Sequence, residues 1–145
     1  MTVIFSKKCE LGLQAVLFLS VQEKDKKYSA TAISKAIKAP KEFVSKVLQE
    51  LAQKKIVGSK KGKNGGFYLG KAATEIRLID IVEAIDGLDI FHCCVLGFPG
   101  CGTGNPCPVH NVWGPIRERT FKMLSNETLD KLAKKTKNKL ADYIP

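Results

Sequence analysis

The sequence lacks the features that mark membrane and secreted proteins. No apolar run approaches the roughly 20 residues that a helix needs to span a bilayer. The N-terminus also lacks the order of basic, apolar and small residues that is typical of a signal peptide. We therefore expect a cytoplasmic protein with no membrane partner. In that compartment closely spaced cysteines bind metals or take part in redox chemistry rather than forming a disulfide framework.

Residue patterns for catalysis are also missing. There is no Cys-x-x-Cys pair of the kind that thiol redox enzymes use, and no spacing of serine, histidine and acidic residues suggests a hydrolase. With 145 residues, of which 44% are hydrophobic, the chain can form one cored domain with an appended arm. The sequence favours a binding protein, with no small-molecule substrate, over an enzyme.

Acidic residues are scarce in only one half of the chain. Residues 1–71 contain 15 lysines and five acidic residues, a net charge of +10, whereas residues 72–145 contain nine basic and nine acidic residues. A basic half is typical of proteins that bind nucleic acid or another anionic surface. Charge alone also allows a solvated, lysine-rich surface without such a partner.

The first half has the pattern of a winged helix-turn-helix. Apolar periodicity predicts helices over 6–22, 29–37 and 41–55, and Pro40 separates the last two. Two short helices joined by a tight turn are typical of a helix-turn-helix. A β-hairpin is expected over 56–69, because Asn64 and the following glycine tolerate positive φ. Its basic tip suits a wing that contacts the phosphate backbone.

The second half is predicted to be helical on both sides of a long loop. Helices are expected over 74–86 and from about 112 to 124, with Pro115 in the first turn of the later helix, where a missing N–H is tolerated. A short last helix follows. The 112–124 helix has no obvious partner in the winged domain, so its apolar stripe suggests a two-fold dimer. Packing onto the N-terminal domain is the alternative. The stripe comprises Trp113, Ile116, Thr120, Met123 and Leu124.

These patterns predict a mainly α-helical protein with a small β-wing, in three parts. Residues 1–86 are expected to form the winged helix-turn-helix DNA-binding domain, and residues 87–111 a cysteine-rich loop. Residues 112–145 are expected to form a long C-terminal dimerisation helix and a tail.

The predicted loop is the part of the chain with the clearest metal-binding chemistry. It holds four of the five cysteines and both histidines, and glycine and proline recur throughout it. Thiolates and imidazoles at this density suit zinc, copper or iron–sulfur centres. Three cysteines and a histidine also complete a tetrahedral zinc site. An iron–sulfur cluster is expected, and a zinc site or no metal remain the alternatives.

Five segments spread over nearly the whole chain match one known family. They are Phe5-Ser-Lys-Lys-Cys-Glu-Leu-Gly-Leu, Phe43-Val-Ser-Lys-Val-Leu-Gln-Glu-Leu, Gly62-Lys-Asn-Gly-Gly-Phe-Tyr-Leu, Ile79-Asp-Ile-Val-Glu-Ala-Ile-Asp-Gly and the cysteine loop with its Trp113 helix. With them the chain resembles the bacterial iron–sulfur cluster regulators, the winged-helix family that includes IscR and NsrR. The resemblance implies a homodimer that binds near-palindromic double-stranded promoter DNA, as a repressor. Its DNA affinity would depend on a cluster that senses redox, nitric oxide or iron–sulfur status.

The resemblance also implies three cysteine ligands for the cluster. Cys101 and Cys107 match two of them, with five residues in between as in the family. The first ligand is Cys94, with Cys93 as the alternative, because the family's first gap varies in length.

The fourth ligand in the family is not a cysteine. His110 lies three residues after Cys107, where the branch with a two-iron cluster has its histidine. Glu10 is the alternative, because another branch uses an acidic residue from the first helix of the partner subunit. We expect a two-iron two-sulfur cluster rather than a four-iron four-sulfur one.

DNA contacts are expected from the second helix of the motif and from the wing. Ser45 matches the position where the family reads a base edge, and Lys61 matches a basic position of the wing. The complete expected set is Ser29, Lys41, Ser45, Lys46, Gln49, Lys60, Lys61, Lys63 and Asn64.

Overall fold

The fold was analysed as a computed structural model that describes residues 4–23, 25–99 and 104–141. These residues form helices and one two-stranded antiparallel sheet, which confirms the predicted mainly α fold with a β-wing. In chain order the elements are α1 (Lys7–Ser20), α2 (Ala30–Ala36), α3 (Lys41–Gln53), β1 (Val57–Lys60), β2 (Gly66–Leu69), the 3-10 turn η1 (Ala73–Glu75), α4 (Leu78–Ile85), the 3-10 turn η2 (Asp89–Phe91), α5 (His110–Asn126) and α6 (Leu129–Ala141).

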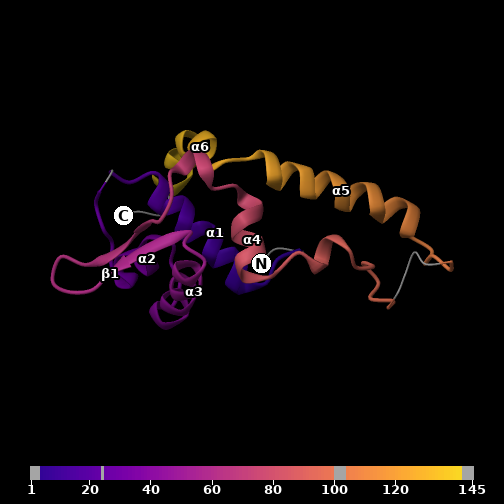
Figure 1. The fold of residues 1–145 in the computed structure, drawn as a ribbon, viewed down its shortest axis with the longest axis horizontal. Helices are drawn as coiled ribbons and strands as arrows, with labels where there is room; N and C mark the ends of the chain where they lie inside the picture. Colours follow the sequence, from indigo (N-terminus) through magenta and orange to yellow (C-terminus); the bar gives the residue numbers. More distant parts are fainter. Residues whose placement is uncertain (1–3, 24, 100–103, 142–145) are drawn as a thin grey trace.

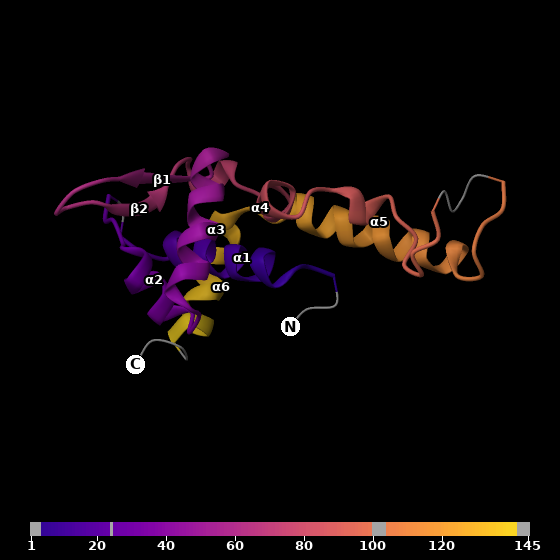
Figure 2. The ribbon, with the colours of Figure 1, turned by 90° about the horizontal axis from the view of Figure 1, so that it is seen from below.

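The elements are arranged along one long axis. The hairpin of β1 and β2 projects from one end, and α5 extends from the other end with the loop that precedes it alongside (Figures 1 and 2). The remaining α-helices gather between these two projections. The DNA-binding elements and the cysteine loop therefore lie far apart along the molecule.

Helix α1 is the centre of the helical body. The side chain of its N-cap, Ser6, accepts a hydrogen bond from the backbone N–H of Cys9, which satisfies one of the free donors at the helix start. The helix is apolar around most of its circumference, and a helix of that kind is buried. It packs against α2, α3, α4 and α6.

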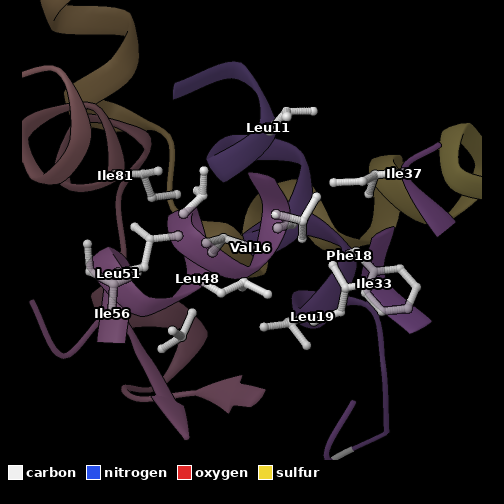
Figure 3. Close-up of a cluster of buried hydrophobic side chains, with 14 of the residues drawn as sticks. Leu11, Val16, Phe18, Leu19, Ile33, Ile37, Leu48, Leu51, Ile56 and Ile81 are labelled. Carbon is white, nitrogen blue, oxygen red and sulfur yellow. The ribbon is translucent and has the colours of Figure 1, made fainter. Parts of the chain in front are cut away.

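The main core lies where α1 meets α3. The buried side of α3 consists of Val44, Val47, Leu48 and Leu51, at the three- and four-residue spacing of one helix face. Figure 3 shows Leu48 and Leu51 beside Val16 of α1, with Ile56 from the start of the wing and Ile81 of α4 closing the cluster. The opposite side of α3 is left for solvent or a partner.

Two helices differ from their predicted bounds. Helix α3 ends at Gln53 instead of Lys55, because Lys55 has a φ of 62° and cannot continue a right-handed helix. Helix α4 begins at Leu78 instead of residue 74. Ile76 is extended, and Asp80 caps the helix by accepting a hydrogen bond from the backbone N–H of Arg77 at 2.9 Å.

The wing forms as predicted, and its turn lies within the expected basic, glycine-rich segment. Lys60 pairs with Gly66, so five residues connect the strands. Positive φ falls on Gly62 (104°) and Gly66 (144°), and not on Asn64. The N–H of Gly65 donates to the carbonyl of Gly62 at 3.0 Å, which closes the turn.

The last helix belongs to the winged domain, although the sequence suggested a tail. Leu129 is fully buried in the main core. Its N–H donates to the carbonyl of Ile76 at 2.9 Å, and the N–H of Leu78 donates to the carbonyl of Glu127 at 3.0 Å. These two bonds fix the start of α6 beside the start of α4. Of the predicted C-terminal region, only α5 therefore extends away from the winged domain.

Helix α5 starts earlier than predicted, at His110. Pro115 consequently lies in the second turn instead of the first. Its missing N–H removes one hydrogen bond, to the carbonyl of Asn111, and the helix continues past it. None of the helices in the described residues is both long enough and apolar enough to cross a bilayer.

Candidate DNA-binding surface and cysteine site

The solvent side of α3 carries the residues expected to read DNA. Lys41, Lys46 and Gln49 are exposed, and Ser45 is half-buried. The amide Nε2 of Gln49 donates to Oγ of Ser45 at 3.4 Å, a long and therefore weak bond. Such a bond leaves Gln49 able to exchange it for the edge of a base, where glutamine pairs well with adenine.

The start of α2 lies beside the base of the wing. Tyr28 exchanges two backbone hydrogen bonds with Phe67 of β2, at 3.0 and 2.7 Å. Gly66 permits this approach, since a Cβ atom there would lie 2.8 Å from the backbone of Tyr28. Ser29 follows directly and caps α2 by accepting the N–H of Ala32 at 3.1 Å. Its hydroxyl hydrogen remains able to donate to a phosphate oxygen.

The wing tip carries a group of exposed basic and amide side chains. Lys60, Lys61, Lys63 and Asn64 are all exposed. Gly62 among them and Gly65 directly after them keep the tip narrow enough to approach a phosphate backbone. Lysine contacts to phosphate give affinity and orientation with little dependence on sequence. The structure thus places all nine expected DNA contacts on α3, at the start of α2 and on the wing.

The cysteine loop brings two of the expected ligands together. Sγ of Cys94 lies 3.3 Å from Sγ of Cys107, although 12 residues separate them in the chain. Both side chains are half-buried. The distance exceeds the length of a disulfide bond, which is about 2.05 Å. The backbone N–H of Leu96 also points at Sγ of Cys94, at 3.4 Å.

This sulfur pair has the geometry and chemistry of a metal-binding half-site. Two thiolates that each lie about 2.3 Å from one tetrahedral metal are about 3.8 Å apart, so Cys94 and Cys107 need to separate by only about 0.5 Å. A backbone N–H directed at a ligand sulfur is one of the features that set the potential of an iron–sulfur cluster. The residues present therefore fit a cluster or a zinc ion.

Cys93 faces a different environment from Cys94. Its side chain is exposed, and its backbone carbonyl accepts hydrogen bonds from Nε1 of Trp113 at 3.1 Å and from Nη1 of Arg117 at 3.2 Å. The carbonyl is thus held toward α5, while the next residue turns its sulfur toward Cys107. This arrangement favours Cys94 over Cys93 as the first ligand.

Of the remaining expected ligands, the described residues include only His110 and the alternative Glu10. Cys101 lies outside the described residues. The backbone N–H of His110 donates to the carbonyl of Cys107 at 3.1 Å, so the two residues are neighbours at the start of α5. Within the described part of the chain, no three His, Cys, Asp or Glu side chains form a group that could hold a metal ion.

Glu10 and Cys9 lie in the first turn of α1. Nζ of Lys7 lies 3.6 Å from the Glu10 carboxylate, whose side chain is 13% exposed. Burial, together with the charge of Asp86 and a hydrogen bond to it, raises the pKa of the Cys9 thiol to about 12. Cys9 is consequently a neutral thiol near pH 7 and a poor metal ligand.

Asp86 also accepts a hydrogen bond from the backbone N–H of Ser6 at 2.9 Å, which joins α1 to the end of α4.

The predicted dimer stripe of α5 divides between two faces. Ile116 and Met123 are about half exposed, and the neighbouring Val112 is about two-thirds exposed. Leu124 was assigned wrongly: it is 3% exposed and packs inside its own chain against Val82 and other residues of a second apolar cluster. Leu124 follows Met123 directly, and the turn of about 100° per residue points it inward.

Trp113 and Thr120 face the cysteine loop and η2 more than the exposed stripe. Both are half-buried, and both line a small recess with Ile90 and Arg117. Sequence reasoning missed Arg117, although its four-residue spacing from Trp113 could have indicated a shared helix face. It also missed the ion pair of Lys8 in α1 with Glu50 in α3, at 2.9 Å.

A helix-turn-helix with a basic wing, joined to a long helix that begins at a cysteine pair, defines a winged-helix transcriptional regulator. The model of the Rrf2 family, described as iron-dependent transcriptional regulators, matches residues 5–135. The chain belongs to this family. This confirms the resemblance found in the sequence.

Individual relatives agree with the family. The chain is 30% identical over 132 residues to an HTH-type transcriptional regulator of Aquifex aeolicus, covering 90% of this chain and 91% of that one. It is 28% identical over 128 residues to the HTH-type transcriptional regulator IscR of Yersinia pseudotuberculosis, covering 88% and 77% respectively. These relatives are transcriptional regulators and not enzymes, as predicted.

A solved structure shares the fold. CymR (YrzC), the global cysteine regulator of B. subtilis, superposes with a TM-score of 0.75 at 21% identity, covering 92% of this chain and 98% of that one. This likeness shows the winged-helix fold, and membership of the Rrf2 family makes the protein a DNA-binding transcriptional regulator.

Proposed function

We propose that the protein is a homodimeric, promoter-binding repressor whose DNA affinity depends on an iron–sulfur cluster. Cys94, Cys101 and Cys107 would hold the cluster, with His110 as fourth ligand. The observation that carries the proposal is the 3.3 Å approach of the Cys94 and Cys107 sulfurs in a protein of this family. When bound, the cluster would supply a centre that responds to redox state, nitric oxide or iron–sulfur supply.

The donor set supports a two-iron two-sulfur cluster. Three thiolates with one imidazole suit iron–sulfur chemistry, and the imidazole raises the reduction potential relative to a fourth thiolate. Glu10 of a second copy is the alternative fourth ligand. The Glu10 side chain, in the first turn of α1, is partly buried but still 13% exposed to a second copy.

Dimer formation is supported by the exposed apolar face of α5. Val112, Ile116 and Met123 are 65%, 49% and 51% exposed, on a helix that projects from the body (Figure 1). A second copy packed on this face would present two recognition helices to two half-sites. The position of the sulfur pair at the start of α5 would let the cluster alter the spacing of those helices.

The decisive experiment is anaerobic purification, followed by a visible absorption spectrum and analysis for iron, acid-labile sulfide and zinc. We expect a coloured protein with iron and sulfide in equal amounts. Colourless protein with one zinc per chain would contradict the cluster in favour of a zinc site. Metal-free protein that takes up neither iron and sulfide nor zinc during anaerobic reconstitution would contradict both metal sites.

DNA binding is tested separately with a duplex selected from a random-sequence library by the metal-loaded protein. Fluorescence anisotropy should give different dissociation constants for loaded and metal-free protein. A ligand shifts DNA affinity only through different affinities for two protein states. Equal constants would therefore remove sensing from the proposal and leave DNA binding intact.

A further inference from the structure

Three side chains of α5 hold the segment that leads into the sulfur pair. Nε1 of Trp113 and Nη1 of Arg117 both donate to the carbonyl of Cys93, at 3.1 and 3.2 Å. One turn further on, the ring of Phe121 packs edge-on against Phe91 of η2, with centroids 5.2 Å apart. Residues four apart share one face of a helix. We call Trp113, Arg117 and Phe121 the anchor row.

The two hydrogen bonds act on a peptide plane that Cys94 shares. A peptide group is planar, so the carbonyl of Cys93 and the N–H and Cα of Cys94 move as one rigid unit. The carbonyl oxygen has two lone pairs, and here it has one donor for each. One of these donors is a guanidinium, and hydrogen bonds from charged donors are the stronger kind. The position of Cys94 beside Cys107 is therefore set from α5.

We propose that Trp113 and Arg117 are positioning residues that transmit a change at the cysteine pair to α5. Any movement of Cys94 that rotates its shared peptide plane displaces the Cys93 carbonyl from both donors. Phe121 lies further along the same face and contacts Phe91, two residues before Cys93, so the segment touches the helix over about two turns. The proposal has two parts. Transmission of movement from the cysteine pair to α5 rests on the proposed function, in which the pair holds the cluster and α5 carries the dimer contact. Anchoring of the Cys93 carbonyl by Trp113 and Arg117 does not rest on it.

The exposed face of α5 is separate from the anchor row. Val112, Ile116 and Met123 repeat at four and seven residues along another side of the helix. A helix held by the cysteine loop on one side and by a second copy on another would pass movement from the first to the second. This transfer of movement depends on the two N–H donors of Trp113 and Arg117, and not on the charge or the size of the anchor-row side chains.

The anchoring part is tested in the full-length, metal-free protein by amide hydrogen exchange of residues 92–97. Arg117→Met removes the guanidinium but keeps chain length, and Trp113→Phe removes the N–H but keeps the ring. Each should speed exchange about fivefold, the change expected from one ordinary hydrogen bond. Lys122→Met is the matched control, because it removes a positive charge from an exposed residue of α5 that pairs with Glu118 at 3.4 Å. Unchanged exchange in both anchor variants would overturn the anchor.

The transmission part is tested with iron–sulfide-loaded and metal-free protein on the selected duplex. The ratio of the two dissociation constants should fall at least about fivefold in Arg117→Met, at equal iron content, and stay unchanged in Lys122→Met. Arg117→Lys keeps a charged donor and should restore part of the ratio. Faster amide hydrogen exchange in Arg117→Met, with an unchanged ratio of the two dissociation constants, would overturn transmission. If wild-type protein takes up no iron, or its ratio is one, the proposed function and transmission both fail, while the exchange result still decides the anchor.

Discussion

The sulfur atoms of Cys94 and Cys107 lie 3.3 Å apart at the start of α5, while the adjacent Cys93 directs its side chain to solvent. Of these two adjacent cysteines, only Cys94 has its thiol beside Cys107, where both could bind one metal. Cys94→Ser should lower bound iron and sulfide to about one tenth of wild type, since a serine hydroxyl is a hard and weakly acidic ligand for iron. Cys93→Ser should keep wild-type content. The opposite result in iron analysis would reverse the assignment.

The wing lysines should act through phosphate charge. Replacing Lys60, Lys61 and Lys63 by alanine should lower the slope of log affinity against log salt by about 0.9 for each phosphate that is no longer neutralised. Anisotropy titrations at four salt concentrations measure this slope. The matched control removes the same charge from the exposed residues Lys131, Lys134 and Lys135 of α6, which lies on the other side of α1 from α3 in Figure 1. Equal salt slopes for the two triple variants would show that the wing lysines do not contact DNA phosphates.

The exposed stripe of α5 should control self-association. Ile116→Asp should raise the dimer dissociation constant at least about 100-fold, because burying an unpaired carboxylate costs several kcal/mol. Sedimentation equilibrium measures the constant, and Lys122→Ala on another face of the helix serves as the control. A wild-type protein that stays monomeric, or an Ile116→Asp dimer as tight as wild type, would show that this face is not the interface.

Helix α6 should be required for the stability of the winged domain. Leu129 is fully buried, so Leu129→Ala should lower the free energy of unfolding by about 2–5 kcal/mol. Urea denaturation followed by circular dichroism measures the change. Lys131→Ala in the same helix is exposed and should shift stability by less than about 0.5 kcal/mol. A similarly small effect of Leu129→Ala would mean that α6 does not complete the core.

The cap of α4 should give a small acid-sensitive contribution. Partial burial tends to raise the pKa of Asp80, but hydrogen bonds from Arg77 and its charge outweigh burial, so the pKa lies below its ordinary value. A lowered folded pKa stabilises above the unfolded value of about 3.9, and this stabilisation is lost as pH falls through the folded value. Asp80→Asn should therefore lower the melting temperature near pH 7 and approach wild type below about pH 3. Because Arg77 is 48% exposed, the effect should stay below about 1 kcal/mol.

A pH-independent difference between Asp80→Asn and wild type would assign the loss to geometry of the cap instead of charge. Asp89→Asn, at an exposed carboxylate in η2, is the control substitution.

The winged helix-turn-helix could be predicted because its signals are local. Apolar spacing in α3 and the basic glycine-rich turn each act within a few residues. The positive φ at Gly66 could not be predicted, because it arises where β2 meets Tyr28, nearly 40 residues earlier in the chain. Long-range pairing overrode the local preference of Asn64.

The arrangement around the cysteines depended on contacts that spacing does not encode. Cys93 and Cys94 are adjacent, so no count of residues distinguishes them. Hydrogen bonds from Trp113 and Arg117 turn the backbone so that one sulfur meets Cys107. In the same way, the burial of Leu124 and the return of α6 follow from where α5 leaves the body, which periodicity alone does not determine.

The pairing of Leu129 with Ile76 also has a consequence for the order of events during synthesis. The backbone bond between them, and that of Leu78 with Glu127, close the DNA-binding core with residues translated after the whole cysteine loop and α5. Contacts at such separation form late, because the intervening chain must first be brought together. A ribosome that has made only the helix-turn-helix and wing has made an unfinished domain. Every molecule that completes its DNA-binding fold therefore already carries its cysteine loop.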